Sequence, residues 1–369
     1  MIYNNLYEAS QNLECQIKIL NKRKRKSFGE FDLYPNNAKD VCCESYKHWV
    51  PCQDYCWKTD KQSKYYNFIK NDILLSMKNS TFVPFNGGDG CGPFNSKCSI
   101  NAVHWDKTCK KKNTKEYFEG TLGVVSTVYP DANGHFLQES LPHWIRFLKS
   151  TNATVLVSES KIQKRFYDYF VTHLGYEKKR FYIKNGPVRA SSLIFYRPFP
   201  KYVGDMIFRP LVVRSPDDYS ILQKYMRPHC IEKYKTLLMI DREKSRSFKN
   251  RNNITKLLKT YSSQMNLTFE VKKLGKNSVY EEACLFQRAR IVFGVHGAGF
   301  ANMIFSRKNT TIIEVGYTEG MSTPQIYFDQ SRFLGLKYYS LIGFGSYTGQ
   351  VRVPIERITD VFRQISFTQ

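Results

Sequence analysis

The sequence contains no long apolar run. None of its apolar stretches approaches the roughly 18 consecutive residues that a membrane-spanning helix needs, and the first residues lack the apolar core of a signal peptide. We therefore expect that nothing in this sequence spans a bilayer, and that the chain associates with a membrane only through an anchor absent from it. The dense basic run at residues 22–26 fits a nuclear address, a heparin-like patch or the cytoplasmic flank of such an anchor.

Acidic residues are scarce relative to basic ones. The 32 Asp and Glu residues accompany 56 Lys and Arg residues, which gives a formal net charge of +24. Such an excess is typical of nucleic-acid-binding proteins, but the basic residues are spread over the whole length and no nucleic-acid-binding motif occurs. We therefore expect no nucleic-acid partner, and we attribute part of the excess to an anionic substrate. The 42% apolar and 15% aromatic content excludes general disorder.

Cysteine is rare after residue 110, where only Cys230 and Cys284 occur. The other eight cysteines are Cys15, Cys42, Cys43, Cys52, Cys56, Cys91, Cys98 and Cys109. Eight cysteines in one short segment predict a disulfide framework in an oxidising compartment. The alternative is a zinc site built around Cys52 and Cys56. We favour disulfides because the sequence has no Cys-x-x-Cys pair and no His-x-x-x-His pair to complete a metal site.

A glycine-rich turn between two apolar runs is the most informative stretch. Residues 291–295 and 310–315 are rich in β-branched residues and short enough to be buried strands of a parallel sheet. Glycines between them would let backbone N–H groups approach a ligand, and the helix that begins near Ala298 favours negative charge at its N-terminus. The turn therefore predicts a phosphate-binding site made by Gly297, Ala298 and Gly299.

Two polar residues end these strands at the edge where open α/β sheets bind ligands. His296 follows the first strand, and Glu314 ends the second. We expect His296 to lie beside a diphosphate and Glu314 to bind the two hydroxyls of a ribose. The alternative is a tight turn around a buried, hydrogen-bonded histidine, because a single glycine-rich turn is a weak signal.

Three sequence blocks together resemble the glycosyltransferases of family 61. Residues 294–302, followed by Phe305 and Ile313-Glu314, are similar to the signature of this family, which contains EGF-domain and O-mannose N-acetylglucosaminyltransferases and plant-type β-1,2-xylosyltransferases. Residues 133–136 with Leu141-Pro142 resemble its upstream motif. Residues 241–253, which include Arg242 and Arg246, resemble its middle Arg-x-x-x-Arg segment. The blocks occur in the family's order, and the resemblance leaves the first hundred-odd residues unexplained.

Strands that alternate with helices predict two α/β domains. In the first, we expect strands at 121–128, 153–158, 180–184 and 191–196 and helices around 137–148 and 162–174. In the second, we expect strands at 236–241, 267–273, 291–295, 310–315 and 337–342 and helices around 254–265, 278–289 and 355–365. Proline-rich residues 198–216 separate the two sets and predict an interdomain crossing.

The predicted organisation is a GT-B-like α/β fold, in which two doubly wound Rossmann-like domains face a cleft. Residues 1–115 would form a stem and a cysteine-rich, disulfide-stapled extension. Residues 116–205 would form the acceptor-side domain, and residues 206–369 the nucleotide-sugar domain, whose last helix could pack back on the first domain. The resemblance to family 61 implies the same architecture.

The second domain supplies the cations that a departing nucleoside diphosphate needs. Arg242 and Arg246 follow a strand, and the fixed fork of arginine suits diphosphate oxygens. With His296 and the turn amides, they would neutralise the leaving group without a metal, and no Asp-x-Asp pair occurs in the sequence. A solvated charged loop is the alternative for the arginines. Asn302 completes the expected donor-binding residues, unless it only caps the short helix or holds the turn.

The first domain supplies the base that removes a proton from the acceptor. Asp131, His135 and Glu139 surround a turn at residues 133–135. We take His135 as the general base, because histidine titrates near neutral pH and this one opens a helix after a strand. Asp131 and Glu139 are the alternatives, and His135 could instead anchor the turn.

These features predict an inverting glycosyltransferase. It would transfer a sugar from a UDP-sugar co-substrate to a hydroxyl of a glycoprotein or glycan, without a cofactor or metal, in the lumen of the endoplasmic reticulum or Golgi or after secretion. The resemblance implies N-acetylglucosamine or xylose as the sugar. The rival hypothesis is a relative that binds sugars or glycoproteins without turnover, and a nucleic-acid-binding protein is third.

Overall fold

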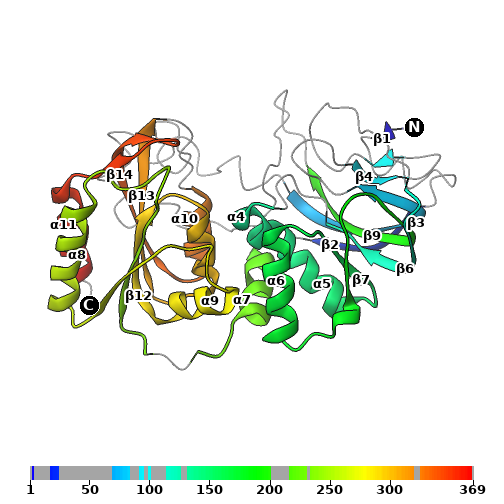
Figure 1. The fold of residues 1–369 in the computed structure, drawn as a ribbon, viewed down its shortest axis with the longest axis horizontal. Coiled ribbons are helices and arrows are strands. Elements are labelled where there is room, and N and C mark those ends of the chain that lie inside the picture. Colours follow the sequence, from blue (N-terminus) through cyan, green and yellow to red (C-terminus); the bar gives the residue numbers. More distant parts are fainter. Residues whose placement is uncertain are drawn as a thin grey trace. The chain divides into compact units, whose positions relative to one another are not determined.

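The structure is a computed structural model that describes residues 2–3, 17–24, 69–83, 91–94, 99–100, 114–125, 131–200, 216–230, 233–319 and 325–367. The described residues divide into two compact units, one up to Met226 and the other from Arg227 onward. Both units combine a sheet with helices (Figure 1). The predicted disulfide framework falls almost entirely outside the described residues, because only Cys91 of its eight cysteines lies in a described strand.

Unit 1 contains a mixed sheet of nine strands. Its order is β1-β5-β4-β3-β9-β6-β7-β8, and β2 pairs with β3. The strands are β1 (Ile2–Tyr3), β2 (Ile17–Lys24), β3 (Ile69–Val83), β4 (Cys91–Phe94), β5 (Ser99–Ile100), β6 (Tyr117–Gly123), β7 (Thr154–Val157), β8 (Phe181–Ile183) and β9 (Val188–Pro200). Strands β6 to β9 are parallel, whereas β3 runs antiparallel to β9 along most of its length. The sheet of this unit is therefore mixed, with a parallel part formed by β6 to β9, whereas the prediction of a doubly wound domain implies a parallel sheet.

The reason is that a long strand from the predicted extension joins the sheet. Strand β3 buries Leu75 and Met77 in the same apolar cluster as Leu122 of β6 and Leu193 of β9. Because these side chains share one core, the pairing of β3 with β9 is stabilised by burial as well as by backbone hydrogen bonds. The described boundaries thus differ from the predicted ones: β2 and β3 belong to unit 1, and this unit continues to residue 226 rather than 205.

The helices of unit 1 lie together on one side of its sheet (Figure 1). They are α4 (Asn133–His135), the π-helical segment η3 (Phe136–Ser140), α5 (Leu141–Ser150), α6 (Lys161–Thr172), the short 3-10 helix η4 (Lys178–Arg180) and α7 (Pro216–Met226). Pro142 stands in the first turn of α5, where proline is tolerated because the backbone N–H that it lacks has no partner within the helix. Helix α7 was not predicted, because its segment begins among prolines.

Unit 2 has the doubly wound arrangement expected from the sequence. Its sheet has the order β11-β10-β12-β13-β14-β15, and all neighbours are parallel except β14 and β15. The strands are β10 (Thr236–Ile240), β11 (Thr268–Lys272), β12 (Ala289–Val295), β13 (Thr311–Glu319), β14 (Lys337–Ser346) and β15 (Val351–Arg352). The helices are α8 (Arg251–Gln264), α9 (Val279–Arg288), the 3-10 helix η5 (Ala298–Phe305), α10 (Gln325–Phe333) and α11 (Ile355–Phe367).

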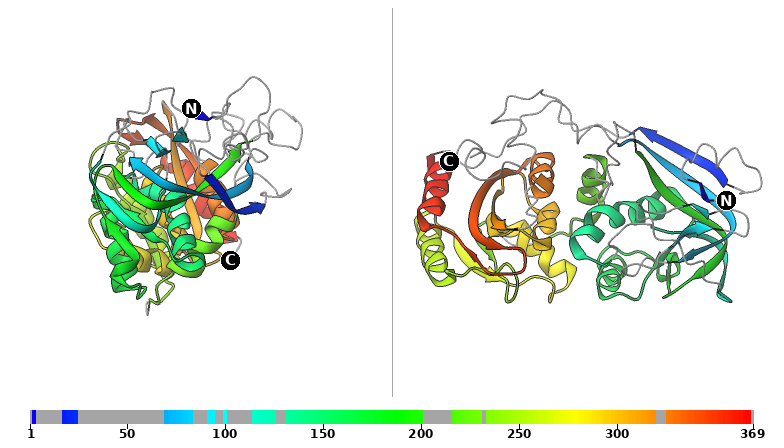
Figure 2. Two further views of the ribbon diagram at one scale, coloured as in Figure 1. Left: turned by 90° about the vertical axis from the view of Figure 1, so that its right-hand side faces the viewer. Right: turned by 90° about the horizontal axis from the view of Figure 1, so that it is seen from above.

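Helices cover both faces of this sheet. Helices α8 and α11 lie on one face, and α9 and α10 lie on the other (Figures 1 and 2). The apolar side of α11 contributes Ile358, Val361 and Phe362 to the core of its own unit, together with Ile254 and Leu258 of α8. The last helix therefore packs on unit 2 itself.

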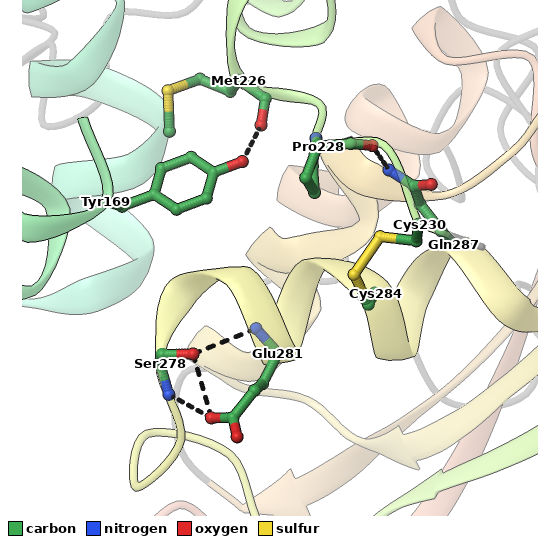
Figure 3. Close-up of a disulfide and its surroundings, with 8 residues drawn as sticks. All are labelled: Tyr169, Met226, Pro228, Cys230, Ser278, Glu281, Cys284 and Gln287. Atoms are coloured by element: carbon green, nitrogen blue, oxygen red, sulfur yellow. Dashed lines mark hydrogen bonds between the residues drawn. A yellow bond between two sulfur atoms is a disulfide. The ribbon is translucent and has the colours of Figure 1, made fainter. Parts of the chain in front are cut away.

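Two local features fix α9 in unit 2 (Figure 3). The first is a capping box: Glu281 N–H donates to Ser278 Oγ over 3.2 Å, and Ser278 N–H donates to a Glu281 carboxylate oxygen over 2.8 Å. Cys230 and Cys284 form a disulfide that ties the start of unit 2 to this helix, which sequence reasoning did not foresee. In the part of the chain that the structure describes, no helix has the length and apolar character needed to cross a membrane.

Candidate functional site

The carboxyl edge of the unit 2 sheet brings together several residues expected in one site. Strands β12 and β13 are parallel neighbours, with Gly294 opposite Glu314. His296 follows β12 directly, and its backbone N–H donates to the Val315 carbonyl over 2.8 Å. His296 and Glu314 therefore meet at one edge, as the strand pattern predicts.

Glu314 is the buried partner of His296. His296 Nδ1 and Glu314 Oε1 are 2.5 Å apart, and Tyr338 Oη donates to the other carboxylate oxygen. Because Glu314 is 0% exposed and both of its oxygens are occupied, this geometry is unlike the predicted contact of Glu314 with a ribose. The carboxylate instead fixes Nδ1 as the donating nitrogen of His296, which leaves Nε2 as the nitrogen for a ligand.

Two half-buried arginines lie next to this histidine. They stand on the loop after β10, where Arg242 Nε donates to the Ser245 carbonyl over 3.0 Å and Arg246 Nη1 donates to the His296 carbonyl over 3.3 Å. Burial, and then the neighbouring guanidinium of Arg246, lower the pKa of Arg242 below its usual value. Among the described residues, neither arginine forms an ion pair with a carboxylate. Two close cations with no carboxylate partner in the described part of the chain create a positive potential that attracts anions.

The glycine turn lies directly against both arginines. A Cβ atom added to Gly297 would lie 2.7 Å from Arg242 Nη1 and 3.3 Å from Arg246 Nη1. Gly297 has φ 163°, an extended backbone conformation that any residue adopts. Glycine matters at this position because it has no Cβ, which lets the two guanidinium groups lie close to the backbone. Gly299 borders apolar side chains instead, because a Cβ there would lie 3.0 Å from Leu274 and 3.4 Å from Ile240. Ala298 between them is exposed.

Tyrosine side chains surround this cluster, and sequence reasoning missed them. The rings of Tyr317 and Tyr327 have centroids 6.2 Å and 5.4 Å from the His296 ring. Burial raises the pKa of the Tyr317 hydroxyl, and the positive charge of Arg246 opposes this shift. Tyr347 lies under the Arg246 guanidinium at 4.5 Å. The signal that could have found Tyr317 is its place three residues after Glu314, at the same sheet edge.

Asn302 lies in the interior of unit 2 rather than among the arginines. Its side chain is 2% exposed and donates to Glu282 Oε2 over 3.3 Å. The other oxygen of Glu282 accepts the Gly275 N–H over 2.5 Å. Asn302 therefore links η5 to α9 and the preceding loop.

A second histidine and carboxylate pair occurs in unit 1, where the chain forms a π-helix. His135 Nδ1 and Glu139 Oε1 are 2.7 Å apart, and their side chains are 31% and 4% exposed. The buried Glu139 orients the more exposed His135, while Asp131 Oδ1 accepts from Ser158 Oγ and Gln163 Nε2 at 3.4 and 3.3 Å. Asp131 thus serves the turn between β7 and α6. Isolated π-helical turns occur frequently at functional sites.

No three His, Cys, Asp or Glu side chains of the described residues converge in the manner of a metal site. Comparison with protein families gives one finding. The model of the family described as Glycosyltransferase 61 matches residues 133–313. This range includes His135, both arginines and the turn after β12, and it ends one residue before Glu314. No curated protein matches the chain.

Proposed function

Because the chain belongs to glycosyltransferase family 61 and is therefore a glycosyltransferase, we propose that it transfers a sugar from a UDP-sugar to a hydroxyl of a glycoprotein or glycan, with inversion at the anomeric carbon. The proposal includes the GT-B class for its two α/β units and a place in the lumen of the secretory pathway. N-acetylglucosamine and xylose are the first sugars to test.

The observation that carries the proposal is the arginine pair at Gly297. A UDP-sugar loses UDP when its glycosidic bond breaks, and the departing diphosphate gains negative charge on its oxygens. Arg242 and Arg246 would accept this charge through their guanidinium forks. Their positive charges lie beside a turn without a side chain, so a diphosphate can approach the backbone.

His296 completes the donor site. As an imidazolium that donates Nδ1–H to Glu314, it would donate its Nε2–H to a diphosphate oxygen. Tyr338 and Glu314 keep the ring in one orientation, because both carboxylate oxygens are occupied by fixed donors. Since this chain of contacts is buried, it positions His296 with little freedom to move.

The acceptor reaction requires a base, and we assign it to His135. The acceptor oxygen forms a bond to the anomeric carbon while the bond from that carbon to the β-phosphate oxygen breaks. The proton of the acceptor hydroxyl passes to His135 Nε2. Glu139 at Nδ1 would stabilise the resulting imidazolium, so we treat it as a positioning residue rather than as the base.

The direct test is to incubate the purified chain with a panel of labelled UDP-sugars and glycoprotein or glycan acceptors. The expected result is label transfer from one UDP-sugar, with a product of inverted anomeric configuration. Binding of UDP-sugars without transfer across the whole panel would favour the alternative, a sugar-binding relative without turnover. Absence of any UDP-sugar binding would contradict the proposal.

The glycine turn yields a matched pair of variants. Gly297→Ala should weaken UDP binding by about tenfold or more, because its Cβ would displace the Arg242 guanidinium. The melting temperature should stay close to that of the parent, since the displaced group is the end of a flexible side chain and the backbone is extended. Calorimetric titration with UDP and thermal melting measure both quantities.

Gly299→Ala is the control on the same turn. Its Cβ would meet only apolar side chains, so UDP binding should remain within about twofold of the parent. If Gly297→Ala and Gly299→Ala weakened UDP binding equally, the loss would come from a general distortion of the turn and not from the contact of Gly297 with the arginines.

Metal independence is a separate prediction. If the arginines and His296 neutralise the leaving group, transfer should continue at the parental rate in excess EDTA. Loss of activity in EDTA that manganese restores would show that the charge of the diphosphate is neutralised by a metal ion instead.

A further inference from the structure

Tyr347 is an exposed aromatic residue at the rim of the donor site. It lies in the turn between β14 and β15, and its side chain is 51% exposed. Exposing a large aromatic ring to water is unfavourable, and such a ring beside a binding site indicates a surface that a ligand covers. Binding of the diphosphate by Arg242 and Arg246 does not by itself require an exposed ring at this position.

The turn that carries Tyr347 is fastened to the arginine loop. Arg246 N–H donates to the Gly349 carbonyl over 2.6 Å, and two further backbone hydrogen bonds of 2.8 Å join Val351 to Ser247 and Lys249. Arg246 itself has φ 58°, in the left-handed region, so this stretch of backbone is held in one conformation by its neighbours. The ring and the cation are therefore positioned together.

Arg246 connects the diphosphate site to this ring. Its guanidinium lies close to Gly297 and also 4.5 Å from the centroid of Tyr347. The guanidinium covers part of the ring, and Tyr317 meets Tyr347 edge to face with centroids 6.3 Å apart. A nucleoside diphosphate carries its base and its phosphates on one ribose, so a base platform must lie near the phosphate cations.

We propose that Tyr347 is the platform on which the nucleobase of the sugar donor stacks. This inference rests on the proposed function and adds the base to the diphosphate contacts already described. Stacking on an aromatic ring is a common mode of nucleobase binding, and it tolerates different bases because each has a π-face. Tyr347 thus contributes affinity for the nucleoside part of the donor.

The same hairpin provides a matched control. Phe344 on β14 is 53% exposed and also lies near a guanidinium, with Arg357 at 5.7 Å from its ring centroid. It differs from Tyr347 in its cationic neighbour, because Arg357 belongs to α11 whereas Arg246 belongs to the loop after β10. Phe344→Ala therefore removes an equally exposed ring outside the proposed site.

The experiment compares two ligands by calorimetric titration of the full chain: UDP, which has a base, and inorganic pyrophosphate, which has none. Tyr347→Ala should weaken UDP binding by about tenfold or more and leave pyrophosphate binding unchanged. Tyr347→Trp should restore UDP binding, and Phe344→Ala should behave like the parent with both ligands. Thermal melting of each variant verifies that the fold is intact.

Three outcomes would overturn this assignment. Equal weakening of both ligands in Tyr347→Ala would show that the ring only positions Arg246. Parental UDP binding in Tyr347→Ala would show that the base lies elsewhere while the donor site stands. If the parent bound neither UDP nor pyrophosphate, the proposed function itself would fail, and the platform with it.

Discussion

His135→Ala is expected to slow sugar transfer by at least about a hundredfold, within the range typical of a lost general base. UDP binding should stay at the parental level, because the residues that we assign to UDP all lie in unit 2. The effect should therefore appear in kcat rather than in the affinity for the donor. Steady-state kinetics together with UDP titration separate the two quantities.

Three further variants define the role of His135. Glu139→Gln keeps the size of the side chain but removes the charge that would stabilise the imidazolium, so transfer should slow while UDP binding stays at the parental level. His173→Ala removes an exposed histidine of the same unit and should leave transfer unchanged. If His135→Ala kept near-parental turnover while Asp131→Asn was inactive, we would have assigned the base to the wrong side chain.

Arg242→Ala and Arg246→Ala should each weaken UDP binding by about tenfold to a hundredfold. The estimate follows from hydrogen bonds to charged groups, which contribute roughly 1.5–3 kcal/mol each. Arg246→Lys should recover only part of the loss, because lysine keeps the charge but not the fork. Titration with UDP at fixed ionic strength measures these changes, since salt screens the attraction.

In the absence of UDP, Arg242→Ala and Arg246→Ala should melt at or above the melting temperature of the parent. The lowered pKa of Arg242 reflects burial and a like charge, both of which oppose its charged form, so removing either arginine relieves repulsion. Lys244→Ala is the charge-matched control, because Lys244 is exposed on the same loop. If Lys244→Ala weakened UDP binding as much as Arg242→Ala, the effect would come from net charge rather than from a built site.

Sequence reasoning succeeded best in unit 2, where local patterns coincide with tertiary structure. The apolar runs that became β12 and β13 are buried on both faces, and the capping box at Ser278 fixes the start of α9. Such features depend on residues close in sequence. The meeting of His296 with Glu314 then follows from parallel register alone.

It failed where the fold depends on distant segments. Strand β3 pairs with β9 more than a hundred residues away in sequence, and nothing in its own residues indicates this partner or the antiparallel direction. The Cys230–Cys284 disulfide is likewise a product of packing, since both residues had no predicted partner. Helix α10 lies between the predicted strands at 310–315 and 337–342, where no helix was predicted.

In the candidate site, residue types were predictable from the sequence, whereas the contacts between the side chains were not. The sequence identified His135, Glu139, His296 and Glu314 as candidates, but treated each carboxylate as an independent base or ribose ligand. Their burial and hydrogen bonds instead pair each one with a histidine. Which side chain faces solvent and which lies behind it is a property of packing that residue types do not reveal.

The central claim is that a nucleoside diphosphate binds at the carboxyl edge of the unit 2 sheet. Hydrogen–deuterium exchange of the full chain, with and without saturating UDP, tests it most directly. We expect UDP to slow exchange in residues 242–249 and 295–299, with no comparable change in residues 131–150. Protection confined to other segments, or no protection at a UDP concentration that titration shows to be saturating, would contradict the account.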